Sequence, residues 1–368
     1  MNSETQVYED LCQHLEGKPI DVKAKTSDVE TSILKQLYTP EEAKIATKLS
    51  INPEPPRQIH NRIDGGEITQ QELKETLEQM AYKGTVFVKQ EGYDEKKYSG
   101  AGFLFSGMYT FQAGRLTEDL AKDFNHFFYE TYTANEETKL KKRILEFRAV
   151  PVEEAIPDSE RSRVSDSDNV RKMIENVKGR IVVSHCICRQ TKEYQEEFCT
   201  TTHLRETCLV LGQDRAEQYN DMGIGRQIDR DEALDIYNKS QEAGLVIQPE
   251  NTQQPEFICF CCGDCCAILV SAKKLARPSK FYASNYYITV DPESCITCGA
   301  CVERCPMDAL SMVNQVASVD LNRCIGCGNC VTTCGGEALR LKKKSKEIVP
   351  PKSQEDLYKR ILNGVIRA

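Results

Sequence analysis

The sequence predicts an α+β protein built from several domains, and three observations lead to this prediction. The chain has 368 residues, more than one hydrophobic core usually serves. Helical apolar spacing near the N-terminus is followed by two strand-like runs, at 85–90 and 96–107. Of the 18 cysteines, all but one lie in the second half of the chain, where two stretches repeat one another. We therefore expect separate N-terminal, central and C-terminal domains.

The N-terminal region, residues 1–150, has the element order of a winged-helix domain. Residues 28–50 carry helical spacing with a second helix start at Thr39, because threonine can cap a helix and the following proline suits its first turn. A further helix, "ITQQELKETLEQMAYKG", ends at Gly84. The two strand-like runs complete the order helix, helix, helix, hairpin. We expect a winged-helix-like domain with a helical extension over residues 113–148.

Charge and hydropathy exclude several classes of protein. A net charge of −8 gives no general attraction to phosphate backbones, and the basic stretch "RLKKKSK" is short. The apolar runs fall far short of the roughly 20 residues that span a bilayer, and the polar start "MNSETQVYEDLCQ" lacks a signal-peptide pattern. We expect a cytoplasmic protein with no membrane span and no nucleic-acid partner. Thiols stay reduced there, which favours metal ligation over disulfides.

Two cysteine motifs stand in residues 285–345. "CITCGACVERCP" and "CIGCGNCVTTCG" both follow C-x2-C-x2-C-x3-C, and equivalent positions are 29 residues apart. Three close thiolates from a tight loop can bind three corners of a cubane, while the fourth cysteine points to the other cluster. We therefore expect two [4Fe-4S] clusters, one held by Cys295, Cys298, Cys301 and Cys334 and the other by Cys324, Cys327, Cys330 and Cys305.

This C-terminal region resembles a bacterial two-cluster ferredoxin, which implies a ferredoxin-like 2[4Fe-4S] domain followed by a tail at residues 346–368. One position departs from the family pattern. The proline that usually follows the fourth cysteine is present as Pro306 but is replaced by Gly335 in the second half. This replacement is expected to relax the loop near Cys334. Structural zinc, the alternative, explains neither the third cysteine of each motif nor the repeat.

A cysteine-rich central α/β region is expected at residues 175–275. Cys186 and Cys188 are expected to share one face of a strand, as are Cys259 and Cys261, because side chains two apart on a strand point the same way. If the two strands are neighbours, four thiolates converge. The nine candidate ligands are Cys186, Cys188, Cys199, Cys208, Cys259, Cys261, Cys262, Cys265 and Cys266.

Five of these nine lie in the stretch "CFCCGDCC". Cys262 is expected to face away from Cys259 and Cys261, whereas Cys265 and Cys266 are expected on the first turn of a helix that begins near Asp264. The helix dipole favours thiolates at that position. The two remaining cysteines, at 199 and 208, are expected in a loop.

Soft thiolates in this number suit iron-sulfur clusters or zinc. Three alternatives stay open: two additional clusters, one cluster with spare or redox-active thiols, or a zinc site. His185 and His203 lie beside these cysteines and are interpreted as hydrogen-bonding neighbours. Cys12 stands apart from the motifs and is interpreted as a partly buried thiol.

The pattern "HCICR" followed by "ICFCCGDCC", together with both end domains, resembles multidomain iron-sulfur proteins of anaerobic bacteria and archaea. The resemblance implies electron transfer, in which a chain of clusters relays single electrons to or from a partner oxidoreductase or carrier. The chain lacks the phosphate-loop and dinucleotide signatures, so a flavin or nucleotide would sit on the partner. Whether the protein is itself an enzyme stays open.

Two alternative functions are considered. One is a cluster-sensing transcription regulator, but its recognition helix at residues 69–83 is rich in glutamate, whereas groove-reading helices need basic and amide side chains. The other is a reductase with a substrate site at a central cluster, where Arg189 and Arg226 would hold an acidic substrate.

Overall fold

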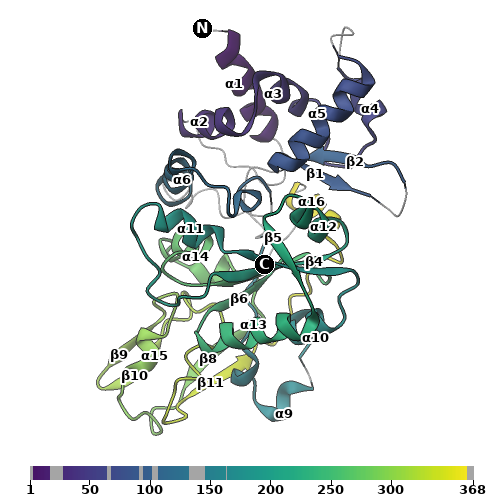
Figure 1. Cartoon of the computed structure of the whole chain (residues 1–368). Coiled ribbons are helices and arrows are strands. Elements are labelled where there is room, and N and C mark those ends of the chain that lie inside the picture. The colour runs from purple at the N-terminus through teal and green to yellow at the C-terminus, as the bar shows by residue number, and fades with distance from the viewer. Residues whose placement is uncertain are drawn as a thin grey trace. The chain divides into compact units, whose positions relative to one another are not determined.

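The computed structural model describes residues 3–16, 28–63, 68–90, 94–101, 107–131, 146–162 and 164–362 (Figure 1). The chain divides into two compact units that alternate along the sequence. Unit 1 comprises residues 1–134, 178–197 and 210–227, and unit 2 comprises residues 135–177, 198–209 and 228–368.

Unit 1 begins with helices, and their ends carry the caps that the sequence predicts at Thr39 and Gly84 as well as one at Thr69 that it did not predict. The side chain of Thr39 accepts a hydrogen bond from the backbone of Glu42, and Thr69 does the same for Glu72. Gly84 ends α5 with a φ of 78°, which glycine adopts without steric cost. The helices are α1 (Ser3–Glu16), α2 (Asp28–Leu37), α3 (Pro40–Ala46), α4 (Pro56–His60), α5 (Gln70–Lys83) and α6 (Glu118–Asn125).

A hairpin follows α5, as the sequence predicts. Strands β1 (Val86–Lys89) and β2 (Lys97–Gly100) pair antiparallel, with Val86 opposite Gly100. Nearby, Tyr109 and Phe124 are fully buried with their ring centroids 4.8 Å apart. These aromatic side chains form part of the core of unit 1.

The helical extension expected over residues 113–148 is correct only in part. Helix α6 and the π-helical segment η3 (His126–Thr131) lie within it, and residues 132–145 are outside the described residues. The expectation is wrong for 146–148, because Phe147 forms an antiparallel bridge with Glu250. Its ring is 1% exposed, so this short extended segment is held by burial.

The central strands belong to both units. In unit 1, β3 (Arg180–His185) lies beside β5 (Gly225–Ile228), and β4 (Glu206–Gly212) is the next strand after β3. In unit 2, the beginning of β4 adjoins β7 (Phe257–Cys261), which pairs antiparallel with β6 (Val246–Pro249). The helices between these strands are α11 (Ile187–Glu193), α12 (Asp214–Asp221), α13 (Arg230–Glu242) and α14 (Ala267–Lys273).

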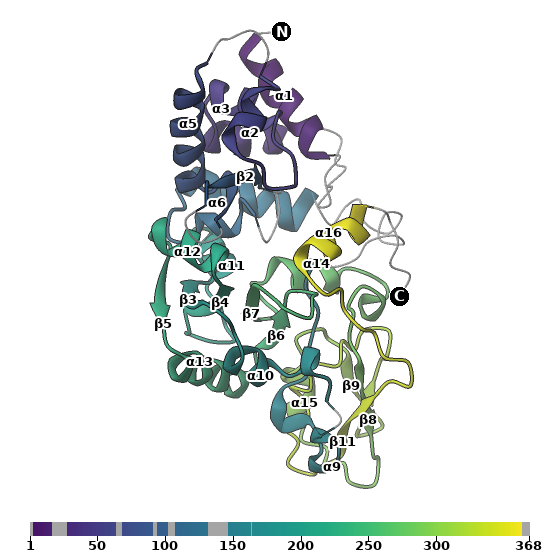
Figure 2. The same cartoon turned by 90° about the vertical axis from the view of Figure 1, so that its right-hand side faces the viewer.

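The C-terminal part of unit 2 contains two antiparallel strand pairs at one end of that unit (Figure 2). Strand β8 pairs with β11, and the hairpin β9–β10 follows the short helix α15. The elements are β8 (Tyr286–Val290), α15 (Ala300–Glu303), β9 (Leu310–Val313), β10 (Val316–Val319), β11 (Leu339–Lys343) and the later helix α16 (Gln354–Leu362).

A buried ion pair links this end to the preceding segment of unit 2. Arg148 and Asp168 lie 2.5 Å apart, with each side chain 3% exposed. The side chain of Asn285 donates a further hydrogen bond of 2.8 Å to Asp168, so the buried carboxylate is well satisfied. The short elements around it are η5 (Glu153–Ala155), α9 (Asp158–Arg161), η6 (Asp166–Asp168), α10 (Val170–Glu175) and η7 (Pro278–Lys280). None of the helices in the described ranges is both long and apolar enough to cross a membrane.

Candidate functional site

All 18 cysteines lie in described parts of the chain, and none of them forms a disulfide. Seventeen of them, from Cys186 onward, are the ligands expected from the sequence. Cys12 is 5% exposed and lies on α1, far from these motifs in the sequence. The cysteines of unit 2 form three arrangements, which we describe in turn.

The first arrangement surrounds a small cavity. Its walls include Ile288, Leu310 and Val319, so the space is mostly apolar. The cavity brings Cys305 of the first motif together with three cysteines of the second motif. We call these four residues the inner set: Cys305, Cys324, Cys327 and Cys330.

The second arrangement is built around Cys301, which is 7% exposed. Burial raises the pKa of the Cys301 thiol, and the nearby Cys334, Cys298 and Cys295 raise it further. These three neighbours include the fourth cysteine of the second motif, so the exchange between motifs is reciprocal. We call these four residues the outer set: Cys295, Cys298, Cys301 and Cys334.

The electrostatics of the inner set favour a bound cation. Burial raises the pKa of Cys327 to about 12, and the charge of Cys305 adds to the shift. The pKa of Cys330 is also raised, first by burial and then by the charges of Cys327, Cys305 and Cys324. Four thiolates cannot stay close together in an apolar cavity without a positive charge to stabilise them. The donor set and the cavity therefore fit an iron-sulfur cluster.

The sequence repeat is also a repeat of backbone structure. The backbone N–H of Ala309 donates to the sulfur of Cys305 at 3.3 Å, and that of Ala338 donates to Cys334 at 3.2 Å. The two pairs are separated by the same 29 residues as the motifs. Hydrogen bonds of this kind stabilise the thiolate that a metal needs.

The loops of the two motifs share left-handed backbone positions. Thr297 has a φ of 60° and its counterpart Gly326 a φ of 68°. Gly299 and Gly328 match in the same way, with φ values of 75° and 79°. The two loops thus follow one path, although only one of them has glycine at the first of these positions.

The two halves differ in their exposure to solvent. Ile296 in the first loop is 63% exposed, whereas Ile325 at the equivalent position is 2% exposed. Cys298 of the outer set is exposed, and Cys327 of the inner set is buried. The inner half is covered by other parts of unit 2. The backbone carbonyl of Cys327 accepts a hydrogen bond from the backbone N–H of Val152 at 2.9 Å.

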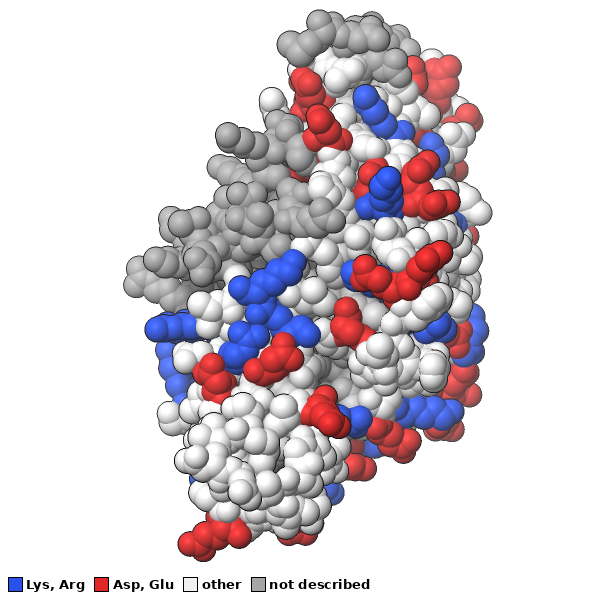
Figure 3. All heavy atoms as spheres, turned by 90° about the vertical axis from the view of Figure 1, so that its left-hand side faces the viewer, with Lys and Arg blue, Asp and Glu red and all other residues white. Residues whose placement is uncertain are grey.

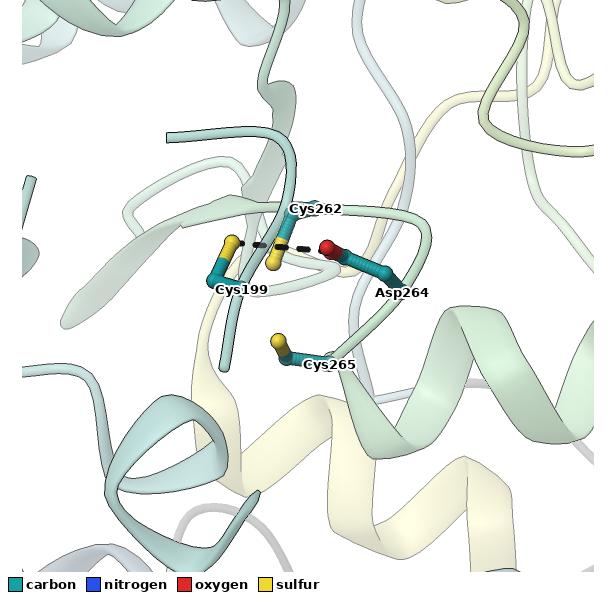
Figure 4. Close-up of side chains that lie close together, drawn as sticks. All are labelled: Cys199, Cys262, Asp264 and Cys265. Carbon is teal, nitrogen blue, oxygen red and sulfur yellow. Dashed lines mark hydrogen bonds between the residues drawn. The ribbon is translucent and has the colours of Figure 1, made fainter. Parts of the chain in front are cut away.

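The third arrangement lies in the central region of unit 2. The ligand atoms of Cys199, Cys262, Cys265 and Asp264 all lie within 4.8 Å of one another. Figure 4 shows Cys262 and Cys265 on either side of the turn that carries Asp264, with Cys199 entering from a separate segment. We call Cys199, Cys262 and Cys265 the central triad.

Asp264 connects the two segments that carry the central triad. Its Oδ2 accepts hydrogen bonds from the backbone N–H of Thr200 at 2.7 Å and the hydroxyl of the same residue at 2.9 Å. Its Oδ1 accepts from the hydroxyl of Thr201 at 3.2 Å and from the Cys199 thiol at 3.6 Å. The sequence analysis did not predict this role, although the aspartate stands between cysteines in "CCGDCC".

The thiols of the central triad share protons. Hydrogen bonds from Cys262 and Cys265 lower the pKa of Cys199, whereas the bond to Cys199 raises that of Cys265. Burial opposes ionisation of Asp264, but hydrogen bonds from Cys262 and Thr200 outweigh it and lower its pKa. Three sulfur donors and a carboxylate this close together form a donor set suited to a metal ion.

The remaining cysteines of the central stretch lie elsewhere. The sulfur of Cys259 is 3.9 Å from that of Cys208, which is on β4 and not in the expected loop. The amide of Gln248 contacts the Cys266 sulfur at 3.7 Å. Cys266 is the N-cap of α14, which begins at Ala267, so the helix starts later than expected from the sequence. Residue 265 accordingly precedes the helix.

The expectation for Cys186 and Cys188 is wrong in its geometry. Strand β3 ends at His185, Cys186 is the N-cap of α11, and Cys188 lies in the first turn of that helix. The neighbours of β7 are β4 and β6, so β3 does not lie beside it. Within unit 1, hydrogen bonding to Cys188 and burial raise the pKa of Cys186.

The sequence analysis also singled out two histidines and two arginines near these cysteines. His185 is exposed, and its Nδ1 lies 3.2 Å from the side-chain amide of Gln190. His203 is exposed and is not among the ligand atoms grouped with the central triad. Arg189 is fully buried on α11, and its charge lowers the pKa of Cys186, whereas Arg226 is exposed on β5.

Comparison with known proteins identifies part of the chain. Residues 287–335 match the family of 4Fe-4S dicluster domains. This region is therefore an iron-sulfur domain of the ferredoxin type, and its general function is electron transfer. No curated protein and no solved structure matches the chain.

Proposed function

We propose that the chain is an electron-transfer protein that relays single electrons through two [4Fe-4S] clusters to or from a partner oxidoreductase. The observation that carries this proposal is the cavity in which Cys305 meets three cysteines from the other motif. This exchange of the fourth cysteine is the ligand pattern of two-cluster ferredoxins. The inner set would hold one cluster and the outer set the other.

Each [4Fe-4S] cluster, when bound, accepts and releases one electron. The chain's own groups set how readily this happens. The backbone N–H groups of Ala309 and Ala338 point at ligand sulfurs and favour the more negative, reduced state. Lys344 lies close enough to Cys324 for the two to interact electrostatically, and its positive charge acts in the same direction.

The outer set supports contact with a partner protein. Cys298 is exposed, and so are the apolar side chains of Ile296 in the same loop and of Val313 on β9. Figure 3 shows that the lower lobe, which carries β9 and β10, presents mainly uncharged atoms. A partner that docks on this lobe would come close to the outer set and would have few charged side chains to desolvate.

The central cysteines extend the proposed relay inside unit 2. Gly263, between Cys262 and Asp264, packs so closely on Pro306 that an added Cβ would lie 2.7 Å from the Pro306 carbonyl oxygen. Pro306 directly follows Cys305 of the inner set. We propose that the central cysteines bind metal at this end of the route, and that the winged-helix-like N-terminal region serves as a docking module.

Cysteine variants of the full chain test this function. Anaerobic reconstitution is expected to load about eight irons and eight sulfides into the two sets, by the count of eight cysteines. Because Cys305 belongs to the inner set, C305S and C324S are expected to alter the same electron paramagnetic resonance signal of the reduced protein. C12S is the control and should leave both signals intact.

The relay itself is tested by electron delivery. The reduced parent protein is expected to pass electrons to a one-electron acceptor, and C305S to do so more slowly. A colourless, zinc-loaded preparation without labile sulfide would contradict the proposal. So would C305S and C334S altering one and the same signal, because the two residues are assigned to different clusters.

A further inference from the structure

We propose that the central triad and Asp264 bind a single metal ion, zinc or iron, with three thiolates and one carboxylate, rather than an iron-sulfur cluster. The inference rests on the proposal above that the central cysteines bind metal, but it does not depend on electron transfer by the dicluster domain, because these residues lie outside residues 287–335. The number of central cysteines favours additional iron-sulfur clusters. The present inference assigns three of the nine to a single metal ion instead.

The spacing of the ligand atoms carries the inference. All four lie within 4.8 Å of one another. Around one tetrahedral ion with metal–sulfur bonds of about 2.3 Å, neighbouring sulfurs lie about 3.8 Å apart. In a cubane two iron atoms stand between any two cysteine sulfurs, which must therefore lie farther apart. The central triad is too compact for a cubane.

The dicluster domain provides an internal comparison. The inner set lines a cavity in the dicluster domain. In the described residues, which include every cysteine, the central triad with Asp264 is the one group of three or more potential ligands within 4.8 Å. No three cysteines of the inner set or of the outer set lie within 4.8 Å of one another, so both sets are less compact than the central triad.

The local sequence also fits a mononuclear site. Cys262 and Cys265 are in C-x2-C spacing, which is common for zinc ligands, and both are 2% exposed or less. Cys199, 8% exposed, comes from a separate segment more than 60 residues earlier. A metal ion would fasten this segment to the turn after β7, where burial excludes competing water ligands.

Asp264 is held in the manner of a ligating carboxylate. Its Oδ2 accepts from the N–H and hydroxyl of Thr200, while Oδ1 accepts from the Thr201 hydroxyl and is directed toward the Cys199 sulfur. Outer hydrogen bonds of this kind orient a ligating oxygen and are a regular part of metal sites. A cation would also balance the charge of this half-buried carboxylate beside three sulfur donors.

Metal and sulfide counts on the full chain test the proposal. We expect C199S to lose one zinc or iron ion per chain and no labile sulfide, with the electron paramagnetic resonance signals of the dicluster domain unchanged. C12S is the matched control, since it removes a buried cysteine on α1. Loss of about four irons together with about four sulfides would overturn the proposal, as would no loss of metal.

A second pair of variants covers the case in which C199S does not fold. C265S should lose the same single ion. D264N should retain the turn, because an amide oxygen can still accept from Thr200, but it presents an NH2 group to the metal. We expect D264N to give up the ion to a chelator at least about tenfold more readily than the parent. Equal competition by the chelator would exclude Asp264 as a ligand.

Discussion

Gly263 and Pro306 are in such close contact that a Cβ on Gly263 would lie 2.7 Å from the Pro306 carbonyl oxygen and 2.9 Å from its Cα. Gly263 stands between Cys262 and Asp264, and Pro306 follows Cys305 of the inner set. Backbone atoms cannot move aside as flexible side chains can. The turn at Gly263 and the loop at Pro306 are therefore packed directly on one another within unit 2.

The first prediction concerns this contact. G263A should destabilise the protein by about 1–3 kcal/mol, because the added carbon overpacks a rigid site. The measurement is the free energy of unfolding from anaerobic denaturant titrations. G335A is the control, since its new carbon would meet nothing closer than the Ile296 Cδ1 at 3.8 Å. Equal stability of the two variants would mean that the Gly263 turn adapts freely.

The second prediction compares the two cluster loops. Gly326 has a φ of 68°, and a Cβ there would lie 2.2 Å from the Tyr286 carbonyl oxygen. We expect G326A to lose iron from the inner set while the outer set stays loaded. The iron count and the two electron paramagnetic resonance signals of the reduced protein measure this.

The matching variant of that comparison is T297G. Its φ of 60° costs a threonine about 1–2 kcal/mol, but its hydroxyl donates a 2.7 Å hydrogen bond to the Gln315 carbonyl. Because these effects offset one another, T297G should change stability by no more than about 1 kcal/mol. Full iron loading of G326A, or iron loss in T297G, would show that the loops are not equivalent in the way their backbones indicate.

The third prediction concerns stability at high pH. Burial raises the pKa of Tyr98, and the charges of Glu78 and Glu95 raise it further. The folded state therefore favours the neutral phenol. This contribution is complete below the unfolded pKa of about 10 and is lost as the pH rises through the folded pKa. Y98F should accordingly lose less stability than the parent above about pH 10.

Y98F and Y38F form a matched pair at neutral pH. No described residue is a hydrogen-bond partner of the Tyr98 hydroxyl, whereas that of Tyr38 donates to the Thr85 carbonyl at 3.1 Å. We expect Y98F to be neutral or stabilising by about 1 kcal/mol, and Y38F to cost about 0.5–1.5 kcal/mol. Thermal and denaturant unfolding near pH 8 measure both. A larger loss in Y98F than in Y38F would contradict this.

Features encoded by neighbouring residues could be predicted from the sequence. The caps at Thr39 and Gly84 depend on the residues beside them, and the structure contains both. The iron-sulfur nature of residues 287–335 follows from spacing within two short motifs. The winged-helix assignment and the domain boundaries at 150, 175, 275, 285 and 345 stay predictions.

Features that depend on distant segments could not be predicted. Cys199 joins Cys262 only through the fold, since no local pattern relates the two positions. The rule that side chains two apart share a face applies only within a strand, and β3 ends before Cys186. Residue spacing could not reveal that a helix, α11, begins there instead. Tertiary contacts decide such boundaries.

Because Ile296 is exposed and Ile325 is buried, the two halves of the repeated domain differ in how accessible they are to solvent. If the two halves were equally exposed, either could exchange electrons with a partner. Here one half meets water at Cys298, while the other is enclosed as far as Cys327. If the domain relays electrons as we propose, an electron held at the inner set is shielded from small diffusing oxidants such as dioxygen. Loss of electrons to such oxidants would then be limited to the exposed outer set.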